Sequence, residues 1–359
     1  MASPVVDARV GSVAELLERA ATSHSGAGRT ALARLLSTVE RGGTGAAEIA
    51  RLAHGQGGGA HLVGITGAPG AGKSTLTNEL TTHLRKADAQ VAVLAVDPSS
   101  PYSGGAILGD RIRMADQTLD DGVFIRSMAT RGHLGGLSLA TPAAARLLDA
   151  VGFDRILIET VGVGQVEVEI VGSADTCVVV VNPGWGDAVQ ANKAGLMEIA
   201  DVFVVNKADR PGARETRSDL EQMLGLRGVD TGWTPPVLET VGTSGTGVAE
   251  LAAALDDHRE HLETSGEGAR RTRQRLVNEL RAVVGAQIAA AVSEATAGDE
   301  FRQVCDAVVE RRTDPWTAAT ELVRRVLGGV GPSAPTPPAV STGDGSRTPL
   351  PPGATGPAR

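Results

Sequence analysis

Short apolar runs rich in valine and isoleucine recur along the middle of the chain. The clearest lie at 62–66, 91–96, 155–160, 176–182 and 202–206. Two weaker candidates follow the same composition, at 122–126 and 237–241. The runs do not alternate between apolar and polar residues, which is typical of strands buried on both faces of a parallel sheet. We therefore predict that these runs form the strands of one sheet.

Patterns of helical periodicity separate several of these runs. The helical segments are expected at 74–87, 141–151, 188–200, 214–224 and 247–261. Strands that alternate with helices predict an α/β fold with a mostly parallel, doubly wound sheet. In such a sheet the ligand lies beyond the carboxyl ends of the strands. Candidate chemistry is therefore sought directly after each strand.

The segments on either side of this region are not predicted to contain strands. Residues 1–60 are expected to form a helical extension, in which Ser12 caps a helix that starts at Val13. Residues 61–262 form the sheet domain, and 263–330 are helical again. Residues 331–359 consist mainly of Pro, Gly, Ser and Thr, so we expect a disordered tail there.

Composition and charge narrow the functional classes. The 359 residues carry a formal net charge of −8, which argues against a general nucleic-acid binder or a binder of anionic membranes. No signal pattern precedes the first helix and no apolar run reaches the length of a membrane span, so we expect a cytoplasmic protein. The two cysteines, Cys177 and Cys305, are far apart, and Cys177 in a strand-like run is expected to be a buried free thiol.

A glycine-rich loop joins the first strand to the next helix. Its residues, with the start of the helix, are Gly67, Ala68, Pro69, Gly70, Ala71, Gly72, Lys73, Ser74 and Thr75. The loop matches G-x-x-x-x-G-K-[ST], in which backbone N–H groups and the helix N-terminus bind phosphates. Lys73 would reach the β- and γ-phosphates, and the Ser74 hydroxyl would bind Mg²⁺. The loop predicts a P-loop NTPase that binds a nucleoside triphosphate.

A second motif indicates which base is bound. Asn206, Lys207 and Asp209 follow an apolar strand in the pattern N-K-x-D. The Asp209 carboxylate can accept the N1–H and the 2-amino N–H of guanine, which adenine does not offer in that arrangement. Asn206 would brace the loop, and the stem of Lys207 would lie against the base. A further loop, Thr243, Ser244 and Gly245, is the candidate for the second base contact. We therefore expect GTP and GDP as ligands.

Carboxylates at the ends of two other strands suggest a metal site. Asp97 ends the strand at 91–96, and Glu159 lies at the end of the strand at 155–160. Hard oxygen ligands at neighbouring strand ends suit Mg²⁺ beside the phosphate loop. Gly162 follows Glu159 by three residues, so that its N–H can approach the γ-phosphate as in a D-x-x-G switch, with Glu in place of Asp. Val163 stands where many GTPases carry the Gln that orients water, so we expect intrinsic hydrolysis to be slow. Gln165 is the candidate substitute for that Gln.

Longer blocks carry a more specific resemblance. They are Asp97–Pro101, Gly104–Arg111, Arg126–Gly136, Glu159–Gln165 and Asn182–Asp187. In this order the chain resembles, over roughly residues 29–330, the G-protein chaperones of adenosylcobalamin-dependent acyl-CoA mutases. These are the methylmalonyl-CoA mutase-associated GTPases, formerly called arginine/ornithine transport kinases. The resemblance implies a homodimeric GTPase, held together largely by helices outside the G domain, which makes 263–330 the dimerisation region. It also implies that the nucleotide cycle gates cofactor loading and protects the mutase from inactivation.

The resemblance also assigns roles to individual residues. It implies that Asp97, Asp110 and Glu159 surround the metal and that the loops near 98–113 and 160–170 are switches. It implies a mobile partner-sensing loop from Asn182 to Lys193, and makes Arg111, Arg113 and Lys193 candidates for stabilising the transferred phosphoryl group. The implied partners are the mutase and, as a further candidate, its adenosyltransferase. Methylmalonyl-CoA mutase is the favoured client, and mutases for other acyl-CoA substrates remain alternatives.

Other functions stay open at this stage. An ATP-dependent protein kinase would need an adenine site and an H-R-D-type catalytic loop, which the sequence lacks. A nickel-type metallochaperone GTPase would need thiolates or a histidine tract, but the seven histidines are scattered. A non-hydrolysing scaffold is the third alternative, because Val163 offers no catalytic group.

Overall fold

The computed structural model describes residues 11–98, 117, 119–130, 140–160, 174–184, 198–226 and 232–326. The chain divides into two compact units, Met1–Val283 and Val284–Arg359. Each is described by itself. The first unit contains the sheet, and the described part of the second is helical.

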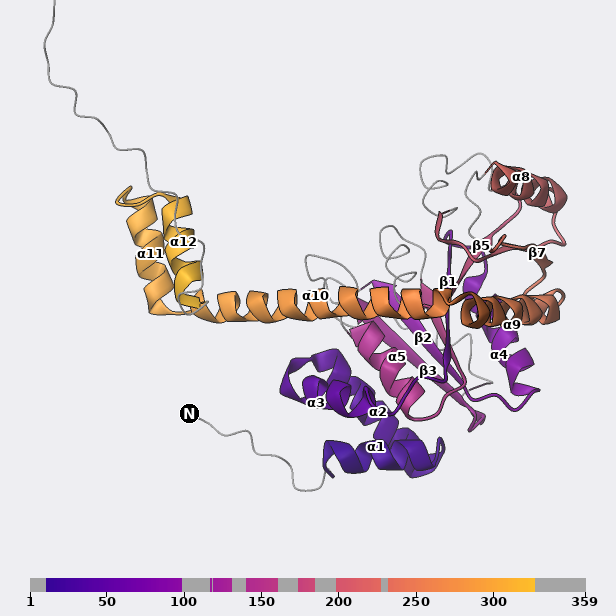
Figure 1. Ribbon diagram of the computed structural model, residues 1–359, viewed down its shortest axis with the longest axis horizontal. Helices are drawn as coiled ribbons and strands as arrows, with labels where there is room; N and C mark the ends of the chain where they lie inside the picture. The colour runs from indigo at the N-terminus through magenta and orange to yellow at the C-terminus, as the bar shows by residue number, and fades with distance from the viewer. Residues whose placement is uncertain are drawn as a thin grey trace, which may run out of the picture. The chain divides into compact units, whose positions relative to one another are not determined.

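The first unit is built on a seven-stranded sheet whose strands all run parallel (Figure 1). The strands are β1 (His61–Gly67), β2 (Val91–Pro98), β3 (Val123–Thr130), β4 (Arg155–Thr160), β5 (Thr176–Val181), β6 (Val202–Asn206) and β7 (Val237–Thr240). Their order is β3-β2-β4-β1-β5-β6-β7, so β1 lies in the middle, between β4 and β5. The predicted doubly wound fold is confirmed, including both weaker strands.

Helices cover both faces of the sheet. On one face α4 (Lys73–Arg85) and α9 (Val248–Ser265) pack on β1, β5 and β6. On the other face lie α5 (Ala140–Ala150) and, farther along the sheet, α8 (Ala213–Gly225). Within β5, Val178 and Val180 face α9, whereas Cys177 and Val179 face the opposite layer. An apolar side chain is therefore required at every position, which explains the run of valines.

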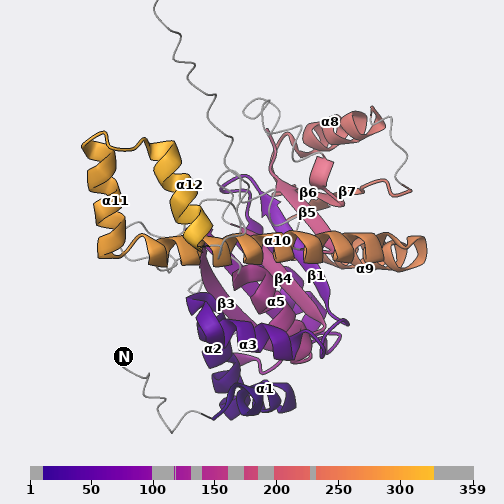
Figure 2. The same cartoon turned by 60° about the vertical axis from the view of Figure 1, so that its left-hand side comes forward.

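Three helices precede the sheet: α1 (Val13–Thr22), α2 (Gly26–Arg41) and α3 (Gly43–Ala53). Ser12 caps α1 in a reciprocal capping box with Glu15. Leu32, Leu35 and Leu36 of α2 are buried in the same core as α5 and strands β2–β4, and Figure 2 shows the three helices beside α5. The predicted N-terminal helices therefore cover the outer part of one sheet face.

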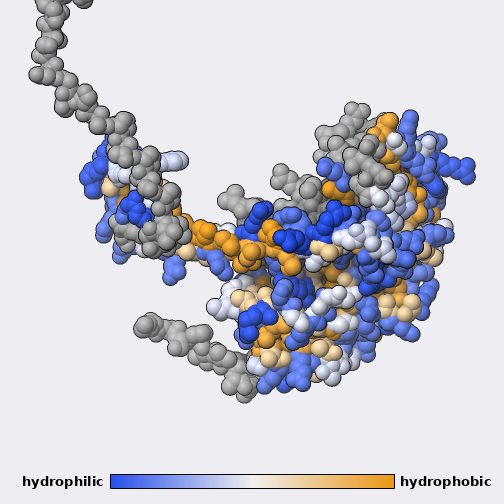
Figure 3. Space-filling model, viewed as in Figure 1, coloured by the Kyte–Doolittle hydropathy of each residue, from blue (hydrophilic) through white to orange (hydrophobic). Residues whose placement is uncertain are grey.

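After α9 the chain forms a long helix, α10 (Glu267–Ala295), which begins in the first unit and ends in the second. None of its 29 residues is buried. Its large exposed apolar residues recur every four positions: Leu276, Leu280, Val284, Ile288 and Val292. We call this set the α10 stripe, and Figure 3 shows apolar side chains along the helix. The second unit continues with α11 (Asp299–Val309) and α12 (Pro315–Val326).

Helix α10 is also long and apolar enough to cross a membrane, the one such helix in the described part of the chain. Length and composition alone are weak grounds for a membrane span. The expectation that the protein does not bind membranes stays a prediction.

The boundaries of several elements differ from the sequence-based ones. Strand β2 runs on to Pro98, so Asp97 lies within it, and β3 extends from 123 to 130. The helical region predicted as 263–330 is broken between α10, α11 and α12, where Asp314 caps α12. Both cysteines are free, Cys177 buried and Cys305 exposed, as predicted for Cys177. Most of the helix expected at 188–200, and the tail 331–359, lie outside the described residues.

Candidate functional site

The glycine-rich loop lies where the central strand meets α4, and its backbone fits only because two positions are glycine. Gly67 ends β1 with φ +136°, and a Cβ there would lie 1.9 Å from the carbonyl oxygen of Val180. Gly72 is the N-cap of α4 with φ +92°, and a Cβ there would lie 2.4 Å from Nδ2 of Asn206. Gly72 has no side chain that could cap α4. The N–H groups of the first turn are therefore available to bind an anion in the loop.

Two lysines hold the loop in this structure. The Nζ atom of Lys73, whose side chain is buried, donates to the carbonyl oxygens of Gly67 at 2.7 Å and Ala68 at 3.1 Å. Lys207 donates from the other side to the carbonyl oxygen of Gly70 at 2.6 Å. Both ammonium groups therefore lie on the loop in which phosphates are predicted to bind. Lys73 can exchange these carbonyl contacts for stronger, charge-assisted ones to phosphate oxygens.

Asn206 connects the loop to the base-reading segment. Its Nδ2 donates to the carbonyl oxygen of Ala71 at 2.8 Å, and its Oδ1 accepts from the N–H of Gly242 at 3.0 Å and the hydroxyl of Thr240 at 3.1 Å. The side chain is buried. One amide thus fixes three segments, which is the bracing role proposed for it. Lys207, directly after it, has φ +62°.

The second base-contacting candidate is a tight turn after β7. The Ser244 N–H donates to the carbonyl oxygen of Val241, and the hydroxyls of Ser244 and Thr246 lie 2.8 Å apart. Thr243, Ser244 and Gly245 therefore lie within reach of the segment that Asn206 holds through Gly242. Asp209 is exposed in the turn after β6. The residues predicted to read guanine are thus gathered at the carboxyl ends of β6 and β7.

The predicted metal ligands lie next to the loop. Ser74 donates from its hydroxyl to the buried Glu159 carboxylate, Oγ to Oε1 2.6 Å. A hydroxyl and a carboxylate oxygen in contact form the kind of hard donor set that Mg²⁺ prefers. Asp97 lies in the strand next to β4, and its side chain is outside the described residues. The hydroxyl of Thr160 donates to that of Thr66 at 3.2 Å, which ties the start of the loop to the Glu159 strand.

Several predicted residues lie outside the part of the chain that the structure describes. They are Asp110, Arg111, Arg113, Gly162, Val163, Gln165 and Lys193. Their roles as metal ligand, phosphate contact or charge stabiliser stay predictions. Thr240 and Gly242, in contrast, are site-supporting residues that the sequence argument missed. A signal existed for Gly242 alone, a glycine directly after the β7 run, but it did not point to Asn206.

The comparison with known proteins decides the family. Residues 32–297 match the family described as methylmalonyl-CoA mutase-associated GTPase MeaB. The chain belongs to this family. Members are named GTPases, and the chain accordingly binds guanine nucleotide and hydrolyses GTP. The resemblance inferred from the sequence blocks is confirmed.

Relatives of this chain come from an archaeon, a bacterium and the mouse. The chain is 48% identical over 304 residues to a protein named as a GTPase in Pyrococcus abyssi, covering 84% of this chain and 94% of the relative. It is 36% identical over 268 residues to the GTPase ArgK of Escherichia coli, covering 72% and 80%. It is 38% identical over 209 residues to the mouse mitochondrial methylmalonic aciduria type A homolog, covering 57% of this chain and 50% of the relative.

A solved structure has the same architecture. The crystal structure titled LAO/AO transport system kinase superposes with a TM-score of 0.63 at 26% identity, covering 90% of this chain and all of that one. The P-loop fold is therefore shared with that protein.

Proposed function

We propose that this GTPase is a chaperone for an adenosylcobalamin-dependent acyl-CoA mutase, with methylmalonyl-CoA mutase as the first candidate. It would gate cofactor loading and protect the mutase from inactivation, with the adenosyltransferase as a second partner. The observation that carries the proposal is the match of residues 32–297 to a family described by its association with this mutase. The named disease homolog in mouse gives further support.

The reaction is attack of water on the γ-phosphate of GTP. Lys73 and the loop N–H groups would stabilise the negative charge that develops on the phosphoryl oxygens. Ser74 and Glu159 would hold Mg²⁺, helped by Asp97 and Asp110, and the ion would neutralise phosphate charge. Arg111 and Lys193 are proposed to add positive charge, and Gly162 to contact the γ-phosphate through its N–H.

The decisive experiment is GTP turnover measured alone and with each candidate apo-mutase, with ATP as the control nucleotide. We expect slow GTP hydrolysis, negligible ATP hydrolysis and acceleration by one mutase. Hydrolysis that no mutase changes would leave a GTPase but remove the chaperone assignment. Turnover of ATP at the rate of GTP would favour the kinase alternative instead.

The nickel-chaperone alternative has a separate test. Among the described residues, no group of three or more His, Cys, Asp or Glu side chains could hold a metal ion. Within that part of the chain the geometry therefore gives this alternative no support. Equilibrium dialysis with Ni²⁺ tests the nickel-chaperone alternative. Retention of the ion in the presence of a weak chelator would support that alternative.

We further propose a cytoplasmic homodimer that pairs through the α10 stripe. The stripe is exposed, and its four-residue spacing forms one i±4 ridge, the kind of surface that packs against another helix at about −50°. A second copy is a better occupant than a bilayer, because two charged residues of the same helix, Arg275 and Glu279, pair with Asp175 and Arg146 of the sheet domain.

A further inference from the structure

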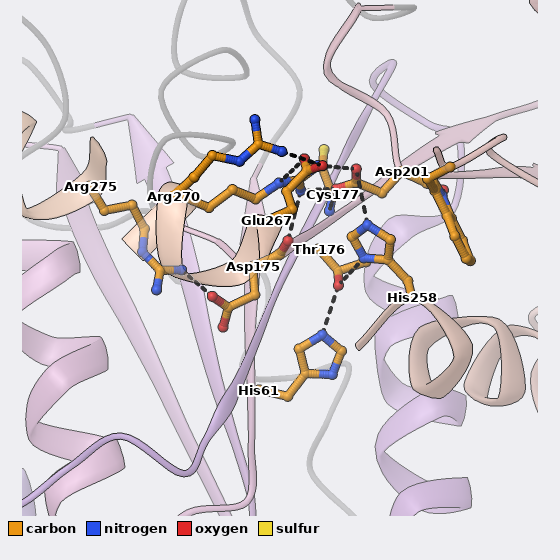
Figure 4. A network of polar contacts seen from close by, with 11 residues as sticks. His61, Asp175, Thr176, Cys177, Asp201, His258, Glu267, Arg270 and Arg275 are labelled. Carbon is orange, nitrogen blue, oxygen red and sulfur yellow. Dashed lines mark hydrogen bonds and ion pairs between the residues drawn. The ribbon is translucent and has the colours of Figure 1, made fainter. Parts of the chain in front are cut away.

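A network of buried polar side chains lies at the amino-terminal end of the strands, the end of the sheet opposite the nucleotide loop. Figure 4 shows it at the amino ends of β1, β5 and β6. The Thr176 hydroxyl lies 2.7 Å from Nε2 of His61 and 2.7 Å from Nδ1 of His258, and all three side chains are buried. Nε2 of His258 lies 3.4 Å from Oδ1 of Asp201. The binding and hydrolysis of GTP proposed above use none of these side chains.

Asp201 is the centre of this network, with a side chain only 8% exposed. Its Oδ2 accepts the N–H of Cys177 in β5 at 2.8 Å, and its own carbonyl accepts the indole N–H of Trp233 at 2.9 Å. Arg271 of α10 forms two parallel hydrogen bonds to the same carboxylate, at 2.8 and 2.9 Å. Planar, bidentate pairs of this kind are among the strongest polar contacts in proteins.

Within the described ranges, three ion pairs join α10 to the sheet domain, and Arg271 also donates to the carbonyl oxygen of Asp175 at 2.9 Å. One face of the helix carries charged residues at four-residue intervals: Glu267, Arg271, Arg275 and Glu279. Arg275 pairs with Asp175, which also accepts the N–H of Leu62 in β1. Glu279 pairs with Arg146 of α5, and these two side chains are 16% and 20% exposed. Glu267 pairs with Arg271 within the helix.

Apolar packing contributes little to this attachment. Helix α9, directly before α10, buries seven residues in the core, including Leu251 and Leu255. Helix α10 buries none: the residues of the α10 stripe are exposed, and Val277 and Val283 are half-buried. The two helices are joined at Gly266, whose φ of +73° allows a sharp change of direction. Helix α9 is therefore held to the sheet by buried apolar side chains, whereas α10 is held to the sheet domain mainly by a few charged pairs.

We propose that residues 267–281 form a salt-sensitive latch, which detaches from the sheet domain as one segment while the sheet and the nucleotide loop stay folded. Release requires breaking the pairs of Arg271, Arg275 and Glu279 but uncovers no core side chain. Segments with few buried apolar contacts open at a small fraction of the global unfolding free energy. A detached helix of this length without a tertiary partner is only marginally stable, so its amides then exchange with solvent.

Salt distinguishes this latch from a hydrophobic attachment by the sign of its effect. The side chains of these pairs are 8–30% exposed. They are therefore screened, although less than fully exposed pairs, as the Debye length falls from about 14 Å near 0.05 M salt to about 3 Å at 1 M. Apolar contacts do not weaken in this way. Salt should therefore loosen α10 and leave α9 unchanged.

Hydrogen exchange of the full chain tests the latch, read by mass spectrometry at a protein concentration at which the chain is monomeric. Pairing of two copies through Leu276 and Leu280 of the α10 stripe would otherwise protect the same amides. We expect peptides within 267–281 to exchange about tenfold faster at about 1 M than at about 0.05 M sodium chloride, with peptides of α9, β1 and β4 unchanged. At low salt, Arg271→Ala should produce a similar increase. The matched control is Arg270→Ala, since Arg270 also pairs with Glu267 but is 76% exposed, and we expect less than about a threefold change.

Three outcomes would overturn the latch. One is exchange in 267–281 that does not respond to salt. Another is an equal effect of the two arginine substitutions. The third is faster exchange of β1 and β4 together with α10, since the contact would then belong to the global fold. The wild-type salt series needs no substitution, so it remains decisive if Arg271→Ala does not fold. Because exchange is measured without nucleotide or mutase, the result is independent of the proposed chaperone function.

Discussion

Asn206 shows how much one side chain can organise in this site. Its amide contacts the phosphate loop on one side and the Thr240–Gly242 segment on the other. The phosphate loop and the base-contacting segment are therefore joined by one rigid side chain, which keeps them at a fixed separation. Pre-organisation of this kind lowers the entropy lost when the nucleotide binds.

Asp209 decides which base is accepted. In Asp209→Asn the amide can no longer accept both N–H groups of guanine, but it can donate to the 2-oxo group of xanthine. We expect GTP affinity to fall about a hundredfold and xanthosine triphosphate to bind better than to the wild type. Titration calorimetry with both nucleotides measures this. An unchanged preference for GTP would remove Asp209 from the base site.

Lys73 should be essential for turnover. Lys73→Ala removes the buried ammonium group that lies on the loop carbonyls, and we expect kcat to fall at least about a hundredfold and GTP to bind more weakly. Phosphate release under saturating GTP measures the effect. Lys86→Ala is the matched control, because Lys86 is exposed at the other end of the same helix and should leave turnover unchanged.

The sequence allowed some of these residues to be predicted and not others. The loop and the N-K-x-D segment are local patterns whose chemistry requires particular residues in a fixed order, so they are readable without a structure. The contact of Asn206 with Gly242 joins positions far apart in sequence, and no local pattern encodes it. The Asp201 network was missed for the same reason, since isolated Asp, Thr and His residues are common in any chain.

At the scale of elements, α10 has two faces with different consequences. The charged face attaches the helix to the sheet domain, and the α10 stripe is available for a second copy. The sequence predicted helices over 263–330, but it could not tell which face of α10 would be covered. Strands were predicted more completely, because buried parallel strands need valine or isoleucine at nearly every position.

The proposed dimer gives a prediction for the α10 stripe. Ile288→Glu places a charge in the predicted helix pairing, and we expect the dimer dissociation constant to rise about a hundredfold or more. Gln287→Glu adds the same charge at the neighbouring exposed position and should have little effect. Sedimentation equilibrium separates the two. Identical association of wild type and Ile288→Glu would exclude the stripe as the interface.

At the scale of the whole molecule, the buried network predicts how stability depends on pH. Burial, with the positive charge of Arg155 and Arg259 nearby, lowers the pKa of His61 to about 3 from its usual 6.5. The unfolded chain therefore takes up a proton below about pH 6.5 that the folded protein refuses until about pH 3. Stability should be unaffected by His61 above pH 6.5 and fall by up to about 1.4 kcal/mol per pH unit below it.

Asp201 adds to this dependence at the acidic end. Burial alone would raise the pKa of its carboxyl, but the nearby His258 ring and the hydrogen bonds from Arg271 outweigh burial and lower it. Stability from this group is therefore lost as pH falls through that lowered pKa, in the same direction as for His61. Urea midpoints between about pH 7.5 and 4.5 measure the His61 part, and midpoints at lower pH add the part of Asp201. His61→Gln should flatten the profile, whereas the exposed control His54→Gln should follow the wild type.

The central position of β1 has a consequence for how the protein is made. The ribosome releases β1 about ninety residues before β4, the earlier of its two neighbours, is complete, which takes roughly 5 to 20 s at usual rates of synthesis. During that time the strand that precedes the phosphate loop has neither neighbour, because β4 and β5 pair with it from later in the chain. Asn206 arrives later still. GTP can therefore stabilise the finished domain, but it cannot guide the first steps of folding on the ribosome.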